Sequence, residues 1–102
     1  MANLFGHYVY AIGSPCHDPA APWRYAVKVG RSRDPELRLS ALQIGNPSAL
    51  ELILSIPFPD RLAAADFERR FHFAHDHARI GGEWFAFDKA AAIEALENFL
   101  DG

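Results

Sequence analysis

The chain has 102 residues, half of them hydrophobic, so it is large enough to fold as one domain with one core. Its formal net charge of −3 argues against a protein that holds nucleic acid with its entire surface, and its single cysteine excludes an internal disulfide. No apolar stretch is long enough to span a membrane, so we expect a single cytoplasmic domain over residues 1–102.

Three segments have the composition of β-strands. Residues 7–12 are rich in aromatic and β-branched side chains, and residues 25–29 alternate apolar and polar side chains before Gly30, which we expect to end the strand. The prolines between residues 13 and 22 predict a long loop that joins these two strands as a hairpin. Residues 50–56 are partly apolar on both faces, which favours a third strand in the middle of the sheet or beneath helices.

Three helices are expected after the second strand, each preceded by an aspartate that can cap its N-terminus. They cover about residues 35–44, 61–75 and 89–100, and their caps are Asp34, Asp60 and Asp88. Between the last two helices, residues 83–87 form a short strand or an extended segment that brings large apolar groups to the core. We therefore predict an α+β fold in which a small, three-stranded, mainly antiparallel sheet is flanked by helices.

The spacing of apolar residues predicts which helix faces are buried. On the first helix, Leu37, Ala41 and Ile44 lie on one stripe that we expect to face the core, with Arg38 at its border. On the second helix, the expected core stripe consists of Ala64, Phe67, Phe71 and Ala74.

Positive side chains gather around the end of the second strand. Lys28 lies in the strand, Arg31 and Arg33 follow in what we expect to be a loop, and Arg38 follows on the first helix. In an acidic chain, this local reversal of charge predicts a site for an anion, most simply phosphate. Taken alone, Arg38 is better explained as a solvated surface arginine, because most arginines on helices are solvated.

Glu68 and His72 are one turn apart on the second helix, so their side chains can act on one ligand or hydrogen-bond to each other. Two further histidines follow His72 within the next five residues, and together with Cys16 or His17 they offer zinc binding as an alternative. Their spacing matches no recurrent zinc pattern, which favours solvated histidines near the C-terminus of the helix.

Several pieces of the sequence, in this order, resemble the GIY-YIG nuclease superfamily. They are Val9-Tyr10 in the first strand, Lys28-Val29-Gly30 in the second, Arg38 in the following helix and Glu68 in a later one. The segments at 27–32 and 34–39, the Glu-His pair and the terminal Gly82-Glu83-Trp84-Phe85 are more similar to the compact bacteriophage-type branch of that superfamily. The resemblance extends from about Tyr8 to Phe87.

The resemblance implies a phosphodiesterase that cuts DNA with one hard divalent cation, Mg²⁺ or Mn²⁺. By position, Glu68 corresponds to the metal-binding glutamate, Arg38 to the arginine that holds the scissile phosphate, and Tyr10 to the tyrosine associated with activating the attacking water. A carboxylate-bound cation and a bidentate arginine can together compensate the charge of the non-bridging phosphate oxygens.

The remaining expected site residues surround this set. Arg31 corresponds to a basic position just after the second motif, and we expect it to bind the DNA substrate together with Arg33 and Tyr8. Tyr8 stands where the first motif has glycine, and Lys28 stands where the second has tyrosine. We place Lys28 among the catalytic residues because it lies on the strand next to that of Tyr10 and its positive charge can favour the Tyr10 phenolate.

The identity of the general base stays open. Tyr10 can act as the base only if nearby cations such as Lys28 or Arg31 favour its phenolate; otherwise it only orients the attacking water. His72 is the other candidate for the general base. Because Glu68 is the one carboxylate of the set, we expect a single metal ion. The alternative function is a catalytically weak or inactive nucleic-acid-binding module of the same fold, and a protein-interaction domain is a third possibility.

Overall fold

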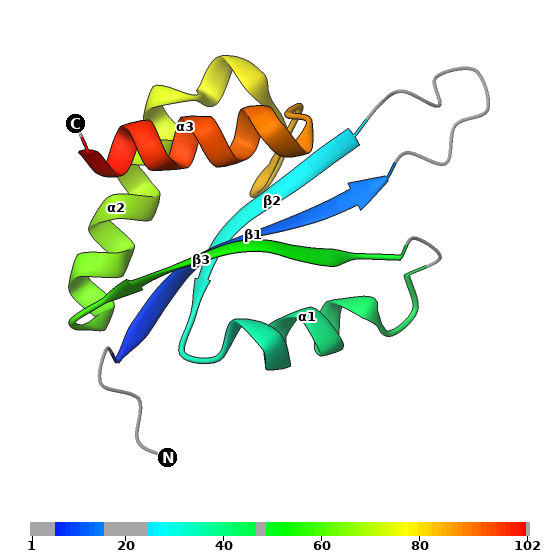
Figure 1. The fold of residues 1–102 in the computed structure, drawn as a ribbon, viewed down its shortest axis with the longest axis horizontal. Helices are drawn as coiled ribbons and strands as arrows, with labels where there is room; N and C mark the ends of the chain where they lie inside the picture. Colours follow the sequence, from blue (N-terminus) through cyan, green and yellow to red (C-terminus); the bar gives the residue numbers. More distant parts are fainter. Residues whose placement is uncertain (1–5, 16–24, 47–48, 102) are drawn as a thin grey trace.

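A five-stranded antiparallel sheet forms the centre of the computed structural model, which describes residues 6–15, 25–46 and 49–101 (Figure 1). The strands lie side by side in the order β3-β1-β2-β5-β4. In chain order the elements are β1 (His7–Pro15), β2 (Tyr25–Ser32), α1 (Pro35–Gln43), β3 (Glu51–Phe58), α2 (Arg61–Ala74), the 3-10 turn η1 (Asp76–Ala78), β4 (Arg79–Gly81), β5 (Trp84–Phe85) and α3 (Lys89–Asp101).

The α+β class and the antiparallel pairing were expected, but the three-stranded sheet was wrong. Two very short strands, β4 and β5, extend the sheet beyond β2. β5 pairs with β2 through Val27 opposite Phe85 and Lys28 opposite Trp84, and Phe85 is completely buried in the core. Burial of this ring, rather than strand length or pattern, accounts for the pairing.

Two further expectations about the strands were also wrong. β3 lies at an edge of the sheet, not in its middle, and pairs with β1 alone among the described strands; the alternative expectation, a strand beneath helices, agrees with its contacts to α1, α2 and α3. Gly30 does not end β2, because the strand continues to Ser32 and pairs Gly30 with Tyr10 of β1. β1 likewise continues past Gly13 to Pro15, so the expected loop begins later; Cys16, His17 and the rest of that segment lie outside the described residues.

The core lies on one face of the sheet, beneath α2 and α3. Its centre is a set of aromatic rings around Phe71, which is fully buried and contacts Phe67, Phe85 and Phe99 at centroid distances of 5.6 to 6.4 Å. α1 covers the opposite face, so that the sheet lies between two helical layers (Figure 1). The buried core residues are Val9, Ala11, Val27, Val29, Ile56, Ala64, Phe67, Phe71, Phe85, Ala92 and Leu96.

The expected buried stripe of α1 was wrong. Leu37 is 68% exposed and Ile44 is 83% exposed, and Ala41 is exposed as well. Only Pro35 of this helix is buried. On α2 the expected stripe is confirmed except for Ala74, which is exposed near the end of the helix.

The aspartate caps are confirmed for all three helices. The side chains of Asp34, Asp60 and Asp88 accept hydrogen bonds from the backbone N–H groups three residues later, at 3.1, 2.8 and 2.7 Å. Each cap satisfies one of the free N–H groups of the first turn. Within the described ranges, no helix is long and apolar enough to cross a membrane.

Gly30 is required because of the tyrosine opposite it, and substitution will test this. A Cβ atom at Gly30 would lie 2.5 Å from the Tyr10 hydroxyl and 2.8 Å from its ring carbon. We predict that Gly30→Ala lowers the free energy of unfolding by about 1–3 kcal/mol, measured by urea denaturation. Gly81→Ala is the matched control, because nothing lies within 4 Å of the added methyl group, and its effect should stay within about 0.5 kcal/mol. Equal effects of the two substitutions would contradict this account.

Candidate active site

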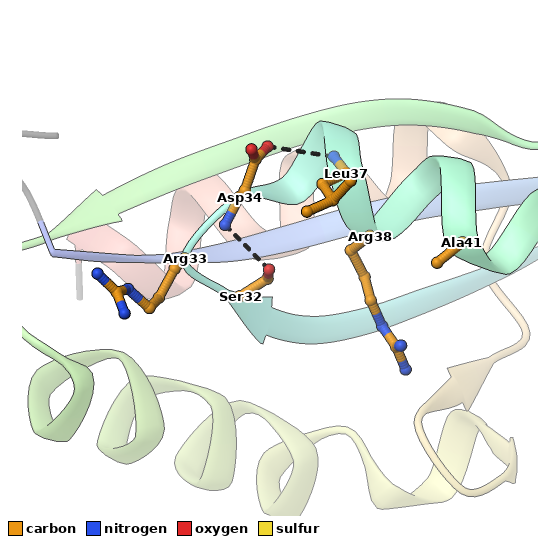
Figure 2. A pocket seen from close by; sticks show the side chains of 6 residues that line it. All are labelled: Ser32, Arg33, Asp34, Leu37, Arg38 and Ala41. Carbon is orange, nitrogen blue, oxygen red and sulfur yellow. Dashed lines mark hydrogen bonds between the residues drawn. The ribbon is translucent and has the colours of Figure 1, made fainter. Parts of the chain in front are cut away.

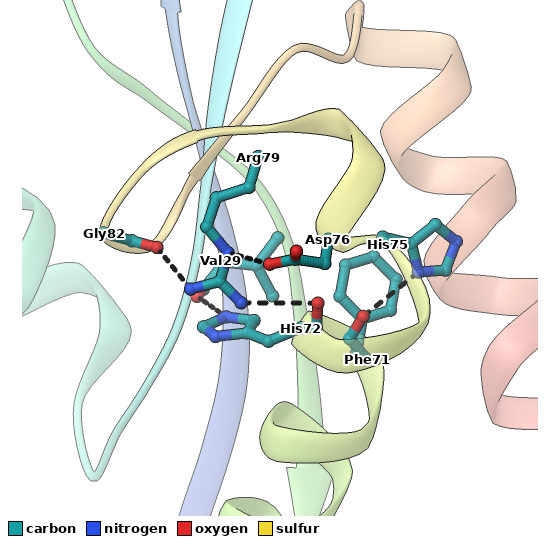
Figure 3. A network of polar contacts seen from close by, with 7 residues as sticks. All are labelled: Val29, Phe71, His72, His75, Asp76, Arg79 and Gly82. Carbon is teal, nitrogen blue, oxygen red and sulfur yellow. Dashed lines mark hydrogen bonds and ion pairs between the residues drawn. The ribbon is translucent and has the colours of Figure 1, made fainter.

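The candidate site is built on the edge of β2 just beyond the end of β5. β5 is only two residues long, so the backbone of Val29 has no ladder partner on that side and bonds to other segments instead. Its N–H donates to the backbone carbonyl of Glu83 at 3.0 Å, and its carbonyl accepts from Nε2 of His72 at 2.7 Å (Figure 3). One residue of β2 thereby holds the backbone of Glu83 and the side chain of His72, which are distant from it in sequence.

Three side chains that can bind a metal ion converge at this edge. Glu68 and His72 come from α2, one turn apart, and Glu83 comes from the turn between β4 and β5. One ligand atom from each lies within 4.8 Å of the other two. Because the Nε2–H of His72 donates to Val29, its Nδ1 atom keeps the lone pair that can accept a proton or bind a cation.

Two cations balance the two carboxylates. Nζ of Lys28 lies 2.9 Å from Oε1 of Glu83, and Nε of Arg31 lies 3.6 Å from Oε2 of Glu68. The first pair is a close ion pair on a nearly buried lysine, whereas 3.6 Å is too long for a hydrogen bond. The Oε2 atom of Glu68 is therefore buried without a hydrogen-bond partner. An orphaned carboxylate oxygen of this kind fits a cation as its missing partner.

The two carboxylates titrate very differently. Burial, together with a hydrogen bond and the negative charge of Glu83, raises the pKa of Glu68 from its ordinary value of 4.5 to about 7. Burial also opposes ionisation of Glu83, but hydrogen bonds from Lys28 and from Glu68 outweigh it and lower the pKa of Glu83. Without a bound cation, Glu68 therefore takes up a proton as the pH falls through about 7, whereas Glu83 stays ionised.

Tyr10 reaches the site from the other face of the sheet. It is 1% exposed, and its hydroxyl lies over Gly30, where Oε1 of Glu83 is also close. Burial raises the pKa of Tyr10 above its ordinary value, although a hydrogen bond with Arg38 opposes this increase. Arg38 itself extends from α1 across β2 (Figure 2). The cations near Tyr10 therefore do not produce a phenolate at neutral pH.

Six of the expected site residues thus surround one edge of the sheet. They are Tyr10, Lys28, Arg31, Arg38, Glu68 and His72. The other two expected residues lie further away. Arg33 points away from Arg38, and both line a hollow of about 300 Å³ beside α1 (Figure 2). Tyr8 is opposite Ser32 and Pro57 in the sheet, two residues along the strand from Tyr10.

A second hollow, of about 510 Å³, opens on the side of the site next to α2. Arg31 and Glu68 line it, together with Leu62, Ala65, Asp66 and Arg69. Arg38 lines the first hollow and Arg31 lines the second, so an arginine is present on each side of the β2 edge. An extended anionic ligand could therefore contact both sides of the carboxylate pair.

The zinc alternative finds no support in the described part of the chain. There, the group that could hold a metal contains His72 but neither His75 nor His77. His75 instead packs its ring on Phe71 at 4.2 Å and forms part of the aromatic core.

Glu83 is the site residue that sequence reasoning did not assign. It was quoted only as part of the Gly-Glu-Trp-Phe segment. Its role depends on β5 docking beside Lys28, which a two-residue strand does not reveal in the sequence. An acidic residue between a Gly-Gly turn and two aromatic residues was the available signal.

The raised pKa of Glu68 predicts a specific pH dependence of stability. Because the folded protein keeps a proton that the unfolded chain loses near pH 4.5, the free energy of unfolding should fall as pH rises from about 4.5 to 7. Glu68→Gln should remove this loss and be more stable than wild type by roughly 1–3 kcal/mol at pH 8, but not at pH 4.5. Urea denaturation with EDTA present measures it. The exposed Glu94→Gln on α3 is the control, and a constant difference between Glu68→Gln and wild type across this range would contradict the shared proton.

Comparison with known proteins places the chain in a family. A family model described as the T5orf172 domain matches residues 7–100, which is nearly the whole chain and includes every residue of the site. No curated protein and no solved structure matched the chain. At a coarse level, this match supports a nuclease-related or DNA-binding role. The chain belongs to the T5orf172 domain family.

Proposed function

We propose that this protein is a divalent-metal-dependent DNA endonuclease of the GIY-YIG type that hydrolyses a phosphodiester with a single metal ion. The observation that carries the proposal is the orphaned, buried Oε2 of Glu68, which lies beside His72 and Glu83 and between arginines on both sides of the sheet edge. Buried carboxylates are costly, and their collection at one point is typical of a functional site.

The residues that would hold the cation are Glu68, Glu83 and His72. Carboxylate oxygens suit Mg²⁺ and Mn²⁺, and an imidazole nitrogen is better tolerated by Mn²⁺ than by Mg²⁺. When bound, the cation would act as a Lewis acid toward a phosphate oxygen. Val29 would keep His72 in the tautomer that leaves Nδ1 available, because its carbonyl accepts the Nε2 proton.

The arginines provide the second source of positive charge. Arg38 is exposed at its position on α1 and can exchange its contact with Tyr10 for a phosphate oxygen. Arg31 lies beside the carboxylates at 3.6 Å, too far for a strong bond, and can turn toward the phosphate of a bound strand. Arg33 extends the positive charge along the first hollow, where the adjacent part of the backbone would lie.

Tyr10 is assigned to orient the attacking water, since burial disfavours its phenolate. His72 could remove a proton only through Nδ1, and it cannot use the same lone pair as a metal ligand. The general base is thus either His72 in a site held by two carboxylates, or a second water when His72 is a ligand. The pH profiles of a His72→Gln variant distinguish these routes.

A binding-only module remains the second candidate, and one observation favours it. Lys28 already pairs with Glu83, and protonation of Glu68 removes its negative charge, so the site can exist without an uncompensated carboxylate and without a metal ion. In that case the same arginines would bind a nucleic-acid backbone and no bond would be cut.

Cleavage of supercoiled plasmid DNA tests the proposal. With Mg²⁺ or Mn²⁺, we predict that the wild-type protein converts the plasmid to nicked or linear forms, and that Glu68→Gln is roughly 100-fold or more slower, because several kcal/mol of charge stabilisation are lost. DNA binding, measured by fluorescence anisotropy, should be retained. Glu94→Gln should cut like wild type. Binding without metal-dependent cleavage in the wild type would support the second candidate instead.

Metal binding has a readout of its own. We predict that Mn²⁺ at 100 times its Kd raises the free energy of unfolding of the wild-type protein by about 2.7 kcal/mol, because it binds only the folded state. Glu83→Gln should lose most of this stabilisation, and EDTA should reverse it. Thermal unfolding with and without Mn²⁺ measures the effect. Equal stabilisation of the wild type and Glu83→Gln would exclude Glu83 as a ligand.

A further inference from the structure

Arg79, on β4, joins the two segments that supply His72 and Glu83. Its Nη1 donates to the carbonyl of Gly82 at 2.9 Å, and its Nη2 donates to the carbonyl of His72 at 3.3 Å. Its Nε lies 3.0 Å from Oδ1 of Asp76, which fixes the plane of the guanidinium group (Figure 3). Neither sequence reasoning nor the proposed chemistry gives this arginine a role.

The two carbonyls that Arg79 binds are close to the candidate ligands in the chain. One belongs to His72 itself, in the last turn of α2, where carbonyl groups lack helical partners. The other belongs to Gly82, the residue immediately before Glu83. A single rigid group with a fixed fork of donors therefore spans the backbones of both ligands.

The turn that carries Glu83 needs an external restraint. It consists of Gly82 and Glu83, directly after Gly81 at the end of β4, and Gly82 has a φ of +56°, which favours glycine. Among the described residues, no heavy atom other than those of the adjacent residues lies within 4 Å of the position that a Cβ would occupy at Gly81 or Gly82. Such a turn loses much conformational entropy on folding, so the bond from Arg79 and the bond from Val29 to the Glu83 carbonyl together hold it in place.

The ring of Phe85 makes a second connection between Arg79 and His72. The guanidinium carbon lies 5.5 Å from the centroid of the Phe85 ring, and that ring lies 5.1 Å from the imidazole of His72. Arg79 and His72 therefore pack against the same buried ring, which limits the motion of both side chains.

We propose that Arg79 is a positioning residue that sets the separation of His72 and Glu83 and so pre-organises the cation site. The inference rests on the proposed function for the identity of the ligand, a divalent cation. Partners that hold metal ligands in place without touching the metal typically contribute 10–100-fold to metal affinity.

Mn²⁺ binding to Arg79→Met and Arg79→Lys tests the proposal. Methionine keeps the apolar contact with Phe85 but removes all donors, so we expect at least about 10-fold weaker Mn²⁺ binding by titration calorimetry. Lysine can restore one carbonyl contact and should recover part of the affinity. The control is Arg70→Met, because Arg70 also pairs with an aspartate, at 2.9 Å, and lies over an aromatic ring, at 5.7 Å, yet contacts no candidate ligand. Wild-type affinity in Arg79→Met overturns the proposal.

A measurement on the metal-free protein separates this inference from the proposed function. The amide of Val29 bonds to the Glu83 carbonyl and is remote in sequence from Arg79, so its hydrogen exchange reports whether the turn is held. We expect faster exchange at Val29 in Arg79→Met, with the amides between β1 and β3 unchanged. If the wild-type protein binds no Mn²⁺, the proposed function fails, and the exchange rate alone decides the role of Arg79. Unchanged exchange at Val29 then overturns it.

Discussion

The candidate site depends on a sheet edge that is left open where a strand stops early. β5 pairs with β2 at only two positions, and the next residue of β2, Val29, then offers an N–H and a carbonyl that no strand satisfies. Buried backbone groups must find partners, and here they bind the Glu83 backbone and the His72 ring. The same requirement that stabilises any sheet edge therefore places two chemically active side chains beside each other.

Each of the two carboxylates at this edge has a positive side chain nearby, but the hydrogen bonds of Glu68 are incomplete. Lys28 pairs closely with Glu83, whereas Arg31 stays too far from Glu68 to bond with it. One oxygen of Glu68 is left without a partner, and the pKa of its carboxyl group is raised as a result of burial and of Glu83. A protein that needed only stability would be better served by an apolar residue at this position. The cost is understandable when the site has a ligand to bind.

Much of the framework could be predicted from the sequence because its signals are local. Capping aspartates indicate where the helices begin, and alternating apolar and polar residues or β-branched side chains indicate the centres of β1 and β2. The short strands could not be found in this way, since β5 exists only because Phe85 buries its ring against the core. The prediction that the apolar stripe of α1 is buried was wrong for a related reason. An apolar pattern such as Leu37 and Ile44 shows that one face differs from the other, but not that something lies opposite it.

The candidate site was predicted only in part, because sequence patterns report local spacing and not tertiary contacts. The spacing of Glu68 and His72 on a helix fixes their proximity, and the order of the motifs suggested that Tyr10 and Arg38 would join them. Glu83 and Arg79 depend on the path of the chain after α2, where Gly81 and Gly82 allow many conformations. Their positions follow from tertiary contacts, which no local pattern encodes.

Arg38 is carried by a helix that buries fewer residues than α2 does. α2 buries Ala64, Phe67 and Phe71, whereas α1 fully buries only its first residue, Pro35; Leu39 and Leu42 are half-buried, and Leu37 and the capping residue Ile44 are exposed. α1 still covers Tyr10 and Ile12, which are fully buried on this face of the sheet. Under the proposed function, Arg38 would therefore approach the polymer from a helix that is separate from the one that carries Glu68 and His72, so that the phosphate-binding and ion-binding groups belong to opposite layers of the domain.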